Sequence, residues 1–118
     1  MSEPFTLAVD AMGGDHAPQV VVDGLAIVAE RHPGARFLLV GDKRAETMLA
    51  ANRRASAVCT MRHAPEVIGN DLKPTAALRM RGASMRVAID AVAAGEALGV
   101  VSAGNTGALL TLAKIVIK

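Results

Sequence analysis

The sequence predicts an α/β fold with a mainly parallel, doubly wound sheet, and three observations support this. Short apolar runs alternate with helical patterns along the chain. Small turns that contain glycine follow several of these runs. The composition, 52% hydrophobic and 20% charged over 118 residues, is that of one small globular domain. Because right-handed crossovers join such units, the strands are expected to run parallel.

The first half of the chain is expected to form two strand-helix units and a third strand. The strands are expected at Thr6–Met12, Arg36–Val40 and Ala55–Met61. A first helix opens at DHAP, residues 15–18, and stops at HPG, residues 32–34. A second helix runs from Lys43 to about Asn52, with Asp42 as its N-cap.

Two helical segments and a last strand are expected in the second half. A basic segment begins at Lys73-Pro74 and reaches Gly82, and a further helix, with Ser84 as its candidate cap, stops at Gly95. The strand Leu98–Val101 then leads through a polar turn into a final helix over 111–118. No stop signal follows that helix. We therefore expect residues 1–118 to be the N-terminal part of one domain in a longer protein, with a sheet that continues.

The turn SAGNTG, residues 102–107, is the first candidate site. In a parallel sheet it lies at the carboxyl end of a strand, where the next helix presents unpaired N–H groups. Gly104 and Gly107 remove the Cβ atoms that would block an anion, and Ser102, Asn105 and Thr106 add short polar groups. The turn is suited to phosphate. A tight turn capped by Asn105 or Thr106 explains the same residues.

The turn after the first strand opens at the same edge of the sheet. Gly13 and Gly14 follow Asp10 closely, and Asp15 and His16 come next. Two such turns can hold an anion between them. A carboxylate in an apolar strand needs partners, so Asp10 is expected to orient turn amides or a catalytic group. Asp15 is also a candidate N-cap, and His16 is either a general acid or base or a side chain that binds a backbone carbonyl.

The composition argues against several other classes of protein. The net charge is only +2 and no Trp or Tyr is present, so no nucleic-acid partner is expected. Cys59 is the single cysteine, and neither a metal site nor a cofactor is expected. The N-terminus lacks the features of a signal peptide, which favours the cytoplasm. Walker, dinucleotide, serine-hydrolase and zincin motifs are absent.

Five stretches of the chain carry a further signal through their order and spacing. They are DAMGGDHAP at 10–18, LVGD at 39–42, HAPEVI at 63–68, RGASMRVA at 81–88 and VSAGNTGAL at 101–109. In these stretches the whole chain resembles the phosphate acyltransferase family of bacterial phospholipid synthesis. One departure is Ala83, where relatives carry a serine before the pair that corresponds to Ser84-Met85.

The resemblance implies a Rossmann-like, three-layer α/β/α fold and an activity. Members transfer a fatty acyl group from acyl carrier protein to inorganic phosphate, and a downstream glycerol-3-phosphate acyltransferase at the membrane uses the acyl phosphate. The resemblance also implies a homodimer that associates peripherally with the cytoplasmic membrane. Members are roughly three times as long as this chain, which again implies an N-terminal part.

Site roles follow from the reaction that the resemblance implies. Phosphate is ionised at neutral pH and can attack a thioester directly, so no covalent enzyme intermediate is needed. Catalytic roles are expected for Asn105, Asp10 and His16. Phosphate or substrate contacts are expected from Gly13, Gly14, Asp15, Ser102, Gly104, Thr106 and Gly107. Two alternatives stay open: a phosphate acetyltransferase-like or decarboxylating dehydrogenase-like enzyme, and a non-catalytic phosphate-binding scaffold module.

Overall fold

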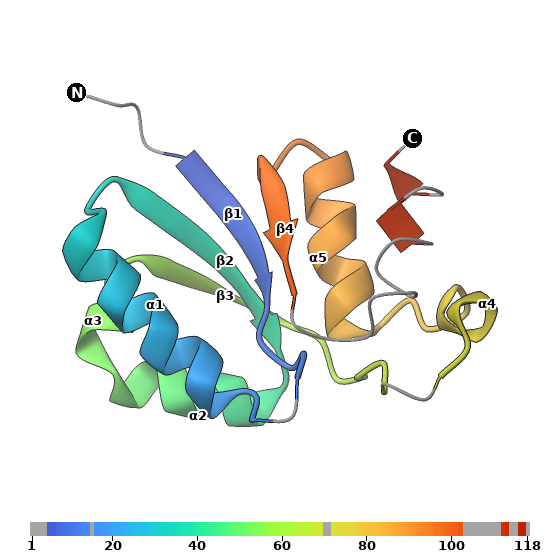
Figure 1. The fold of residues 1–118 in the computed structure, drawn as a ribbon, viewed down its shortest axis with the longest axis horizontal. Coiled ribbons are helices and arrows are strands. Elements are labelled where there is room, and N and C mark those ends of the chain that lie inside the picture. Colours follow the sequence, from blue (N-terminus) through green and yellow to red (C-terminus); the bar gives the residue numbers. More distant parts are fainter. Residues whose placement is uncertain (1–4, 15, 70–71, 103–111, 114–115, 118) are drawn as a thin grey trace.

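A parallel four-stranded sheet forms the centre of the computed structural model (Figure 1). The structure describes residues 5–14, 16–69, 72–102, 112–113 and 116–117. The strands are β1 (Phe5–Asp10), β2 (Ala35–Gly41), β3 (Cys59–His63) and β4 (Gly99–Val101). Their order in the sheet is β3-β2-β1-β4, and the three pairings are all parallel. The predicted α/β fold with a mainly parallel sheet is confirmed.

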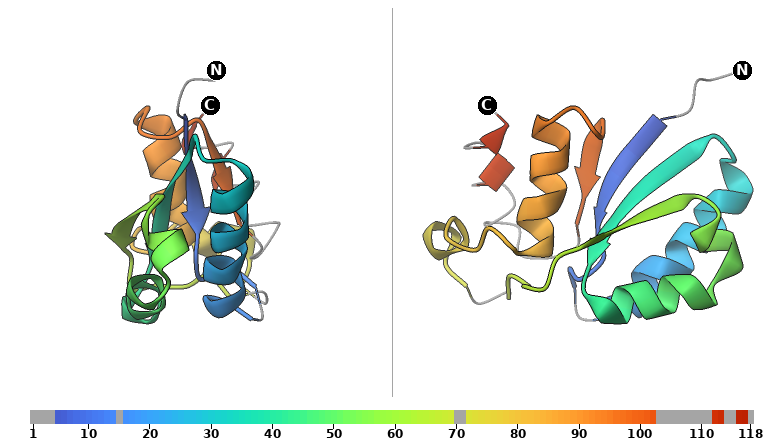
Figure 2. Two further views of the ribbon diagram at one scale, coloured as in Figure 1. Left: turned by 90° about the vertical axis from the view of Figure 1, so that its left-hand side faces the viewer. Right: turned by 180° about the vertical axis from the view of Figure 1, so that it is seen from behind.

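Helices cover both faces of this sheet, as the views in Figure 2 show. One face carries α1 (Gln19–Arg31), α2 (Lys43–Ala51) and α3 (Arg53–Ser56). The other face carries α5 (Ser84–Ala93), with the short α4 (Pro74–Ala77) beyond it. The three layers are those of a Rossmann-like α/β/α fold. Within the described ranges, no helix is long and apolar enough to cross a membrane.

Alternation along the strands supplies a hydrophobic core to each face. In β1, Leu7 and Val9 pack toward α1, whereas Ala8 packs in the cluster that includes α5. The residues of β2 alternate in the same way. Because both faces are covered, the strands consist of almost continuous apolar runs. Leu112, in a described part of the predicted final helix over 111–118, is fully buried in a further cluster with Ile89 of α5.

The register brings the carboxyl ends of the central strands together. Asp10, the last residue of β1, lies beside Val40 of β2, and Val9 lies beside Val101 of β4. The turns that follow β1 and β4 therefore begin at one edge of the sheet. This arrangement is the one that the hypothesis of two facing turns requires.

The third strand begins later than the sequence predicts. Residues 53–56 form α3, so β3 starts at Cys59 rather than at Ala55. The Asn52 side chain accepts a hydrogen bond from Ala55 N at 3.1 Å and caps this helical turn. This hydrogen bond satisfies the Ala55 N–H and stabilises the helical conformation. A strand beginning at Ala55 would not form it.

The segment after Lys73 is helical over a shorter range than predicted. Only Pro74–Ala77 forms a helix, and the expected continuation to Gly82 is wrong. The N–H groups of Arg79 and Met80 each bond to the carbonyl three residues earlier, which is the pattern of tight turns. The first helix also starts later than predicted, at Gln19, because residues 16–18 form a turn.

Gly41, at the end of β2, packs closely against α2 and the turn after β1. A Cβ atom at this position would lie 2.9 Å from Ala45 Cβ and 3.1 Å from Ala11 Cβ. We predict that Gly41→Ala lowers the free energy of unfolding by about 1–3 kcal/mol, because two buried alanines must move. Chemical denaturation of the full-length protein measures the change.

Gly24→Ala is the matched control for this variant. A Cβ at position 24, inside α1, meets no heavy atom within 4 Å. We expect Gly24→Ala to leave the free energy of unfolding unchanged or to raise it by up to about 1 kcal/mol, because alanine favours the helix. Equal losses from Gly24→Ala and Gly41→Ala would contradict the packing argument.

Candidate functional site

Asp10 is a buried carboxylate at the carboxyl end of β1. Its residue is 3% exposed, and its side chain accepts three hydrogen bonds. Oδ1 accepts from Met12 N at 3.0 Å and from Ser84 Oγ at 2.5 Å. Oδ2 accepts from Ser102 Oγ at 2.8 Å. These donors compensate for the loss of water around the carboxylate, and Asp10 does orient a turn amide.

Asp10 and Ser102 are two predicted site residues that the fold brings into contact. They are 92 residues apart in the sequence. The parallel pairing of Val9 with Val101 places the next residue of each strand side by side. Since Ser102 is the first residue of the predicted phosphate turn, the hydrogen bond links that turn to β1.

The turn after β1 is closed by Asp10 itself. The Met12 N–H bonds to the Asp10 carboxylate, a local pattern that turns the chain, so β1 ends before the predicted Met12. Gly13 is buried, and Gly14 has a φ of +96°, which a residue with a side chain rarely adopts. The two glycines therefore belong to the construction of this turn.

Ser84 is part of the same cluster, although the sequence predicts another role for it. Ala83, not Ser84, occupies the N-cap position of α5, and Ser84 is the first helical residue. The cap prediction is wrong because the Ser84 hydroxyl donates to Asp10 of β1. The residue is 1% exposed. Its apolar neighbours, Ala83 and Met85, were the available signal that this hydroxyl would be buried and need a distant partner.

The structure does not join His16 to the Asp10 cluster. His16 is exposed, and within the described chain its side chain makes no hydrogen bond or ion pair. Its backbone carbonyl accepts from Val20 N at 3.2 Å, in the turn that precedes α1. The catalytic role of His16 therefore stays a prediction.

Five predicted site residues fall outside the part of the chain that the structure describes. They are Asp15, Gly104, Asn105, Thr106 and Gly107. The phosphate-binding role of the turn over 102–107 and the catalytic role of Asn105 stay predictions. Ser102 is the predicted residue of this turn whose position is described.

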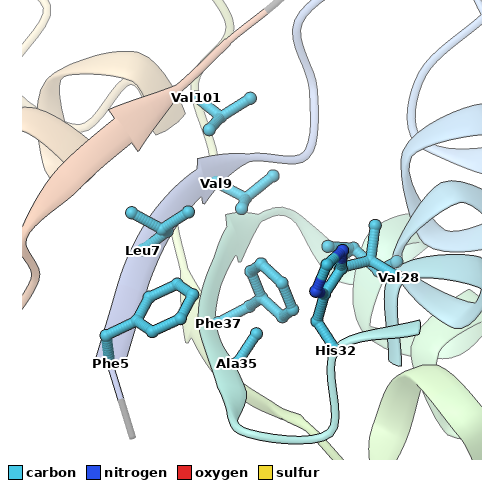
Figure 3. A pocket seen from close by; sticks show the side chains of 9 residues that line it. Phe5, Leu7, Val9, Val28, His32, Ala35, Phe37 and Val101 are labelled. Atoms are coloured by element: carbon cyan, nitrogen blue, oxygen red, sulfur yellow. The ribbon is translucent and has the colours of Figure 1, made fainter. Parts of the chain in front are cut away.

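An apolar hollow of about 380 Å³ lies along the sheet on the face that carries α1 (Figure 3). Side chains of β1 and β2 form its floor, and the end of α1 flanks it. Its lining residues are Phe5, Leu7, Val9, Leu25, Val28, His32, Ala35, Phe37 and Val101. Leu7 and Val9 face α1, whereas the Asp10 carboxylate meets Ser84 of α5. The hollow and the Asp10 cluster therefore lie on opposite faces of the sheet.

Metal ligands and an activated thiol are not found in the described ranges. No group of three or more His, Cys, Asp or Glu side chains there is placed to hold a metal ion. Cys59 is the first residue of β3, beside Phe37 and away from the carboxyl edge. Burial raises the pKa of the Cys59 thiol to about 11. This thiol is therefore protonated at neutral pH and is a poor nucleophile.

The sequence of this chain is similar to a family of known proteins. Residues 5–118 match the family described as "Fatty acid synthesis protein". A phosphate acyltransferase of Granulibacter bethesdensis is 64% identical over 117 residues, which cover 98% of this chain and 32% of the relative. The phosphate acyltransferase of Gluconacetobacter diazotrophicus is 64% identical over 118 residues, covering 99% of this chain and 32% of the relative.

A more distant relative gives the same result. The phosphate acyltransferase of Caulobacter vibrioides is 48% identical over 120 aligned positions, which cover 100% of this chain and 33% of the relative. The chain thus spans about a third of the length of the curated relatives that it matches.

We predict that Asp10→Ala lowers the free energy of unfolding by about 2–4 kcal/mol, because it leaves one buried N–H and two hydroxyls without their acceptor. Urea denaturation of the full-length protein measures the loss. Asp42→Ala is the control, since it removes a carboxylate that caps α2 by accepting from Arg44 N. That variant should lose about 1 kcal/mol. A loss for Asp10→Ala no larger than that would contradict the role of the cluster.

The raised pKa of Cys59 predicts slow alkylation of the folded protein. At about pH 8, the folded chain should hold about a hundredfold less Cys59 thiolate than the unfolded chain, and iodoacetamide should react correspondingly more slowly. Mass spectrometry of the Cys59 peptide, with and without urea, gives the two rates. Comparable rates would show that burial does not protect this thiol.

The same thiol predicts how stability depends on alkaline pH. Because burial raises the pKa of Cys59 to about 11, the unfolded chain loses this proton first. Titration of Cys59 should therefore lower the free energy of unfolding as the pH rises from about 9 to 11. Cys59→Ala should reduce this part of the alkaline loss, and an unchanged alkaline profile would contradict the assignment.

Proposed function

The chain belongs to the family of fatty acid synthesis proteins, and on this premise we propose that the full-length protein transfers a fatty acyl group from acyl carrier protein to inorganic phosphate. Relatives with 64% identity are named phosphate acyltransferase, which supports phosphate as acceptor and an acyl donor. The structural observation that carries the proposal is the 2.8 Å hydrogen bond from Ser102 to Asp10. It ties the proposed phosphate turn to the turn after β1. The product is an acyl phosphate for phospholipid synthesis.

Phosphate binds between the two turns in this proposal. The backbone N–H groups of residues 102–107 and the start of the following helix supply the positive potential for the anion. Gly13 and Gly14 allow close approach from the other side, because neither has a side chain. The donors to phosphate are the hydroxyl groups of Ser102 and Thr106 and the backbone N–H groups of Asp15, Gly104 and Gly107.

The chemical step is direct attack of phosphate on the thioester. A phosphate oxygen forms a bond to the carbonyl carbon, the tetrahedral oxyanion collapses, and the carbon–sulfur bond breaks to release the carrier thiolate. Phosphate is already ionised at neutral pH, so the enzyme contributes chiefly position and electrostatic stabilisation. The protonated state of Cys59 supports a mechanism without a cysteine intermediate.

Three residues have catalytic roles in this scheme. Asn105 donates to the phosphate or to the developing oxyanion, an interaction that contributes about 3–4 kcal/mol when well aligned. Asp10 holds the turn after β1 through Met12 N and binds Ser102. His16 supplies the proton that the leaving thiolate takes up.

The proposal extends to the partners of the full-length protein. It is a homodimer in the cytoplasm that associates peripherally with the membrane, through parts outside this chain. It passes acyl phosphate to a glycerol-3-phosphate acyltransferase. The resemblance in the five sequence stretches supports these assignments.

The proposed reaction predicts thiol release that depends on phosphate. Full-length protein is incubated with long-chain acyl carrier protein, with and without inorganic phosphate, and free thiol is measured. We expect release only with phosphate, because phosphate is the nucleophile. The same assay with acetyl coenzyme A is the comparison. Faster reaction with acetyl coenzyme A would favour an acetyltransferase, and no release from either thioester would favour a binding module.

Asn105→Ala should lower the rate of acyl-phosphate formation at least about tenfold with the fold intact, because it removes a donor to the transition state. Asn52→Ala is the matched control: it removes the same side chain at the cap of α3, before β3 begins. That variant should keep its rate while losing about 1 kcal/mol of stability. An unchanged rate for Asn105→Ala would exclude the proposed role.

A further inference from the structure

We propose that Ser84 is a positioning residue for phosphate binding, acting through Asp10 on Ser102. This inference rests on the proposed function and names a residue of the same site that the reaction scheme does not use. Ser84 Oγ donates to Asp10 Oδ1 at 2.5 Å, and Asp10 Oδ2 accepts from Ser102 Oγ at 2.8 Å. The three side chains form a continuous line from α5, through β1, to the start of the turn after β4.

The two ends of the Asp10 carboxylate have separate partners. Oδ1 is held by Ser84 and by Met12 N, while Oδ2 is left to Ser102. Rotation of the carboxylate would break the bonds on both oxygens at once. Ser84 therefore fixes the direction in which Oδ2 meets the Ser102 hydroxyl, and with it the side chain at the start of the phosphate turn.

Burial makes the link between Ser84 and Asp10 effective. Ser84 is 1% exposed and Asp10 is 3% exposed, so water has little access to this contact. A hydroxyl that donates to a carboxylate in such surroundings makes a short, strong hydrogen bond. Removing the Ser84 hydroxyl leaves Oδ1 with one donor in a place where water cannot easily replace the other.

The position of Ser84 is itself fixed by the loop that contains Glu66. Ser84 N donates to the Glu66 carbonyl at 2.9 Å, and Glu66 N donates to the Gly82 carbonyl at 3.2 Å. Gly82 N also donates to Glu66 Oε1 at 3.1 Å. A Cβ at position 82 would lie 2.7 Å from that same oxygen, so glycine permits the close approach.

Hydrogen bonds join all five sequence stretches that carry the family resemblance. LVGD is bonded to two of the others, through Ala64 N to the Gly41 carbonyl at 2.7 Å and Ala11 N to the Val40 carbonyl at 2.8 Å. Glu66 in HAPEVI holds Ser84 in RGASMRVA, Ser84 holds Asp10 in DAMGGDHAP, and Asp10 holds Ser102 in VSAGNTGAL. Ser84 does not reach phosphate in this arrangement, since Asp10 lies between it and Ser102. Its role is therefore to position the site rather than to contact the substrate.

The first test is phosphate binding by the full-length protein, measured by titration calorimetry with inorganic phosphate. We expect Ser84→Ala to raise the Kd for phosphate by about tenfold, through loss of a hydrogen bond to a buried charge. The KM for phosphate should rise with it, while the KM for the acyl donor stays within about twofold. Ser84→Thr keeps the hydroxyl and should restore most of the affinity. A Kd for Ser84→Ala within about twofold of the wild type would overturn the proposal.

Ala88→Gly is the matched control for general weakening of α5. Ala88 is fully buried in the same helix and is not part of the hydrogen-bonded line. It should lower stability while leaving the phosphate Kd unchanged. A rise in Kd equal to that of Ser84→Ala would show that any damage to α5 has this effect, and it would overturn the positioning role.

A double-mutant cycle tests the path through Ser102. In the Ser102→Ala background, Ser84→Ala should change the phosphate Kd by less than about twofold, because the group that Ser84 positions is gone. The same factor in both backgrounds would contradict the path. This cycle decides the question even where Ser84→Thr fails to fold.

Binding and turnover separate this inference from the proposed function. Wild-type protein that binds phosphate but releases no thiol would overturn acyl transfer, and the Kd values would still decide the role of Ser84. Wild-type protein that does not bind phosphate would overturn both. Normal turnover with unchanged Kd values in the variants would overturn the role of Ser84 alone.

Discussion

A carboxylate can be buried only where the fold supplies hydrogen-bond donors to it, and the rest of this structure depends on meeting that requirement at Asp10. Its partners come from its own turn, from the start of α5 and from the end of β4. Each of those elements must therefore hold a defined position, because the buried Asp10 side chain at the end of β1 needs all of these donors. The same demand makes the cluster a reference point, because a shift of α5 or β4 would leave a buried polar group without a partner.

The sheet provides the frame in which this requirement can be met. Parallel register aligns the ends of β1 and β4, and packing on both faces holds the strands in place. The apolar hollow beside Phe37 uses one face of β1, and the acid uses the other. Because successive side chains of a strand point to opposite faces of the sheet, β1 contributes to an apolar hollow on one face and to a polar cluster on the other.

The sequence predicts the local features of this protein better than the distant ones. Apolar runs and glycine turns locate the strands and the common edge, because these signals lie within a few residues of each other. The helical turn of α3 depends on a side-chain cap at Asn52, which competes with a strand pattern. The role of Ser84 depends on Asp10, 74 positions away, and no local sequence pattern predicts that these two residues are partners. The site prediction therefore found Asp10 and Ser102 but not the residue that joins them to α5.

The separation of these partners also bears on how the protein is made. Asp10 leaves the ribosome 92 residues before Ser102, which at about 5–20 residues per second is a delay of about 5–20 seconds. During that time β1 and β2 can already pair, yet until Ser84 has been synthesised the carboxylate has only its own turn amide as a donor. A nascent chain in this state keeps the end of β1 hydrated and open. Completion of the site is consequently a late event of synthesis, reached only when the fourth strand arrives.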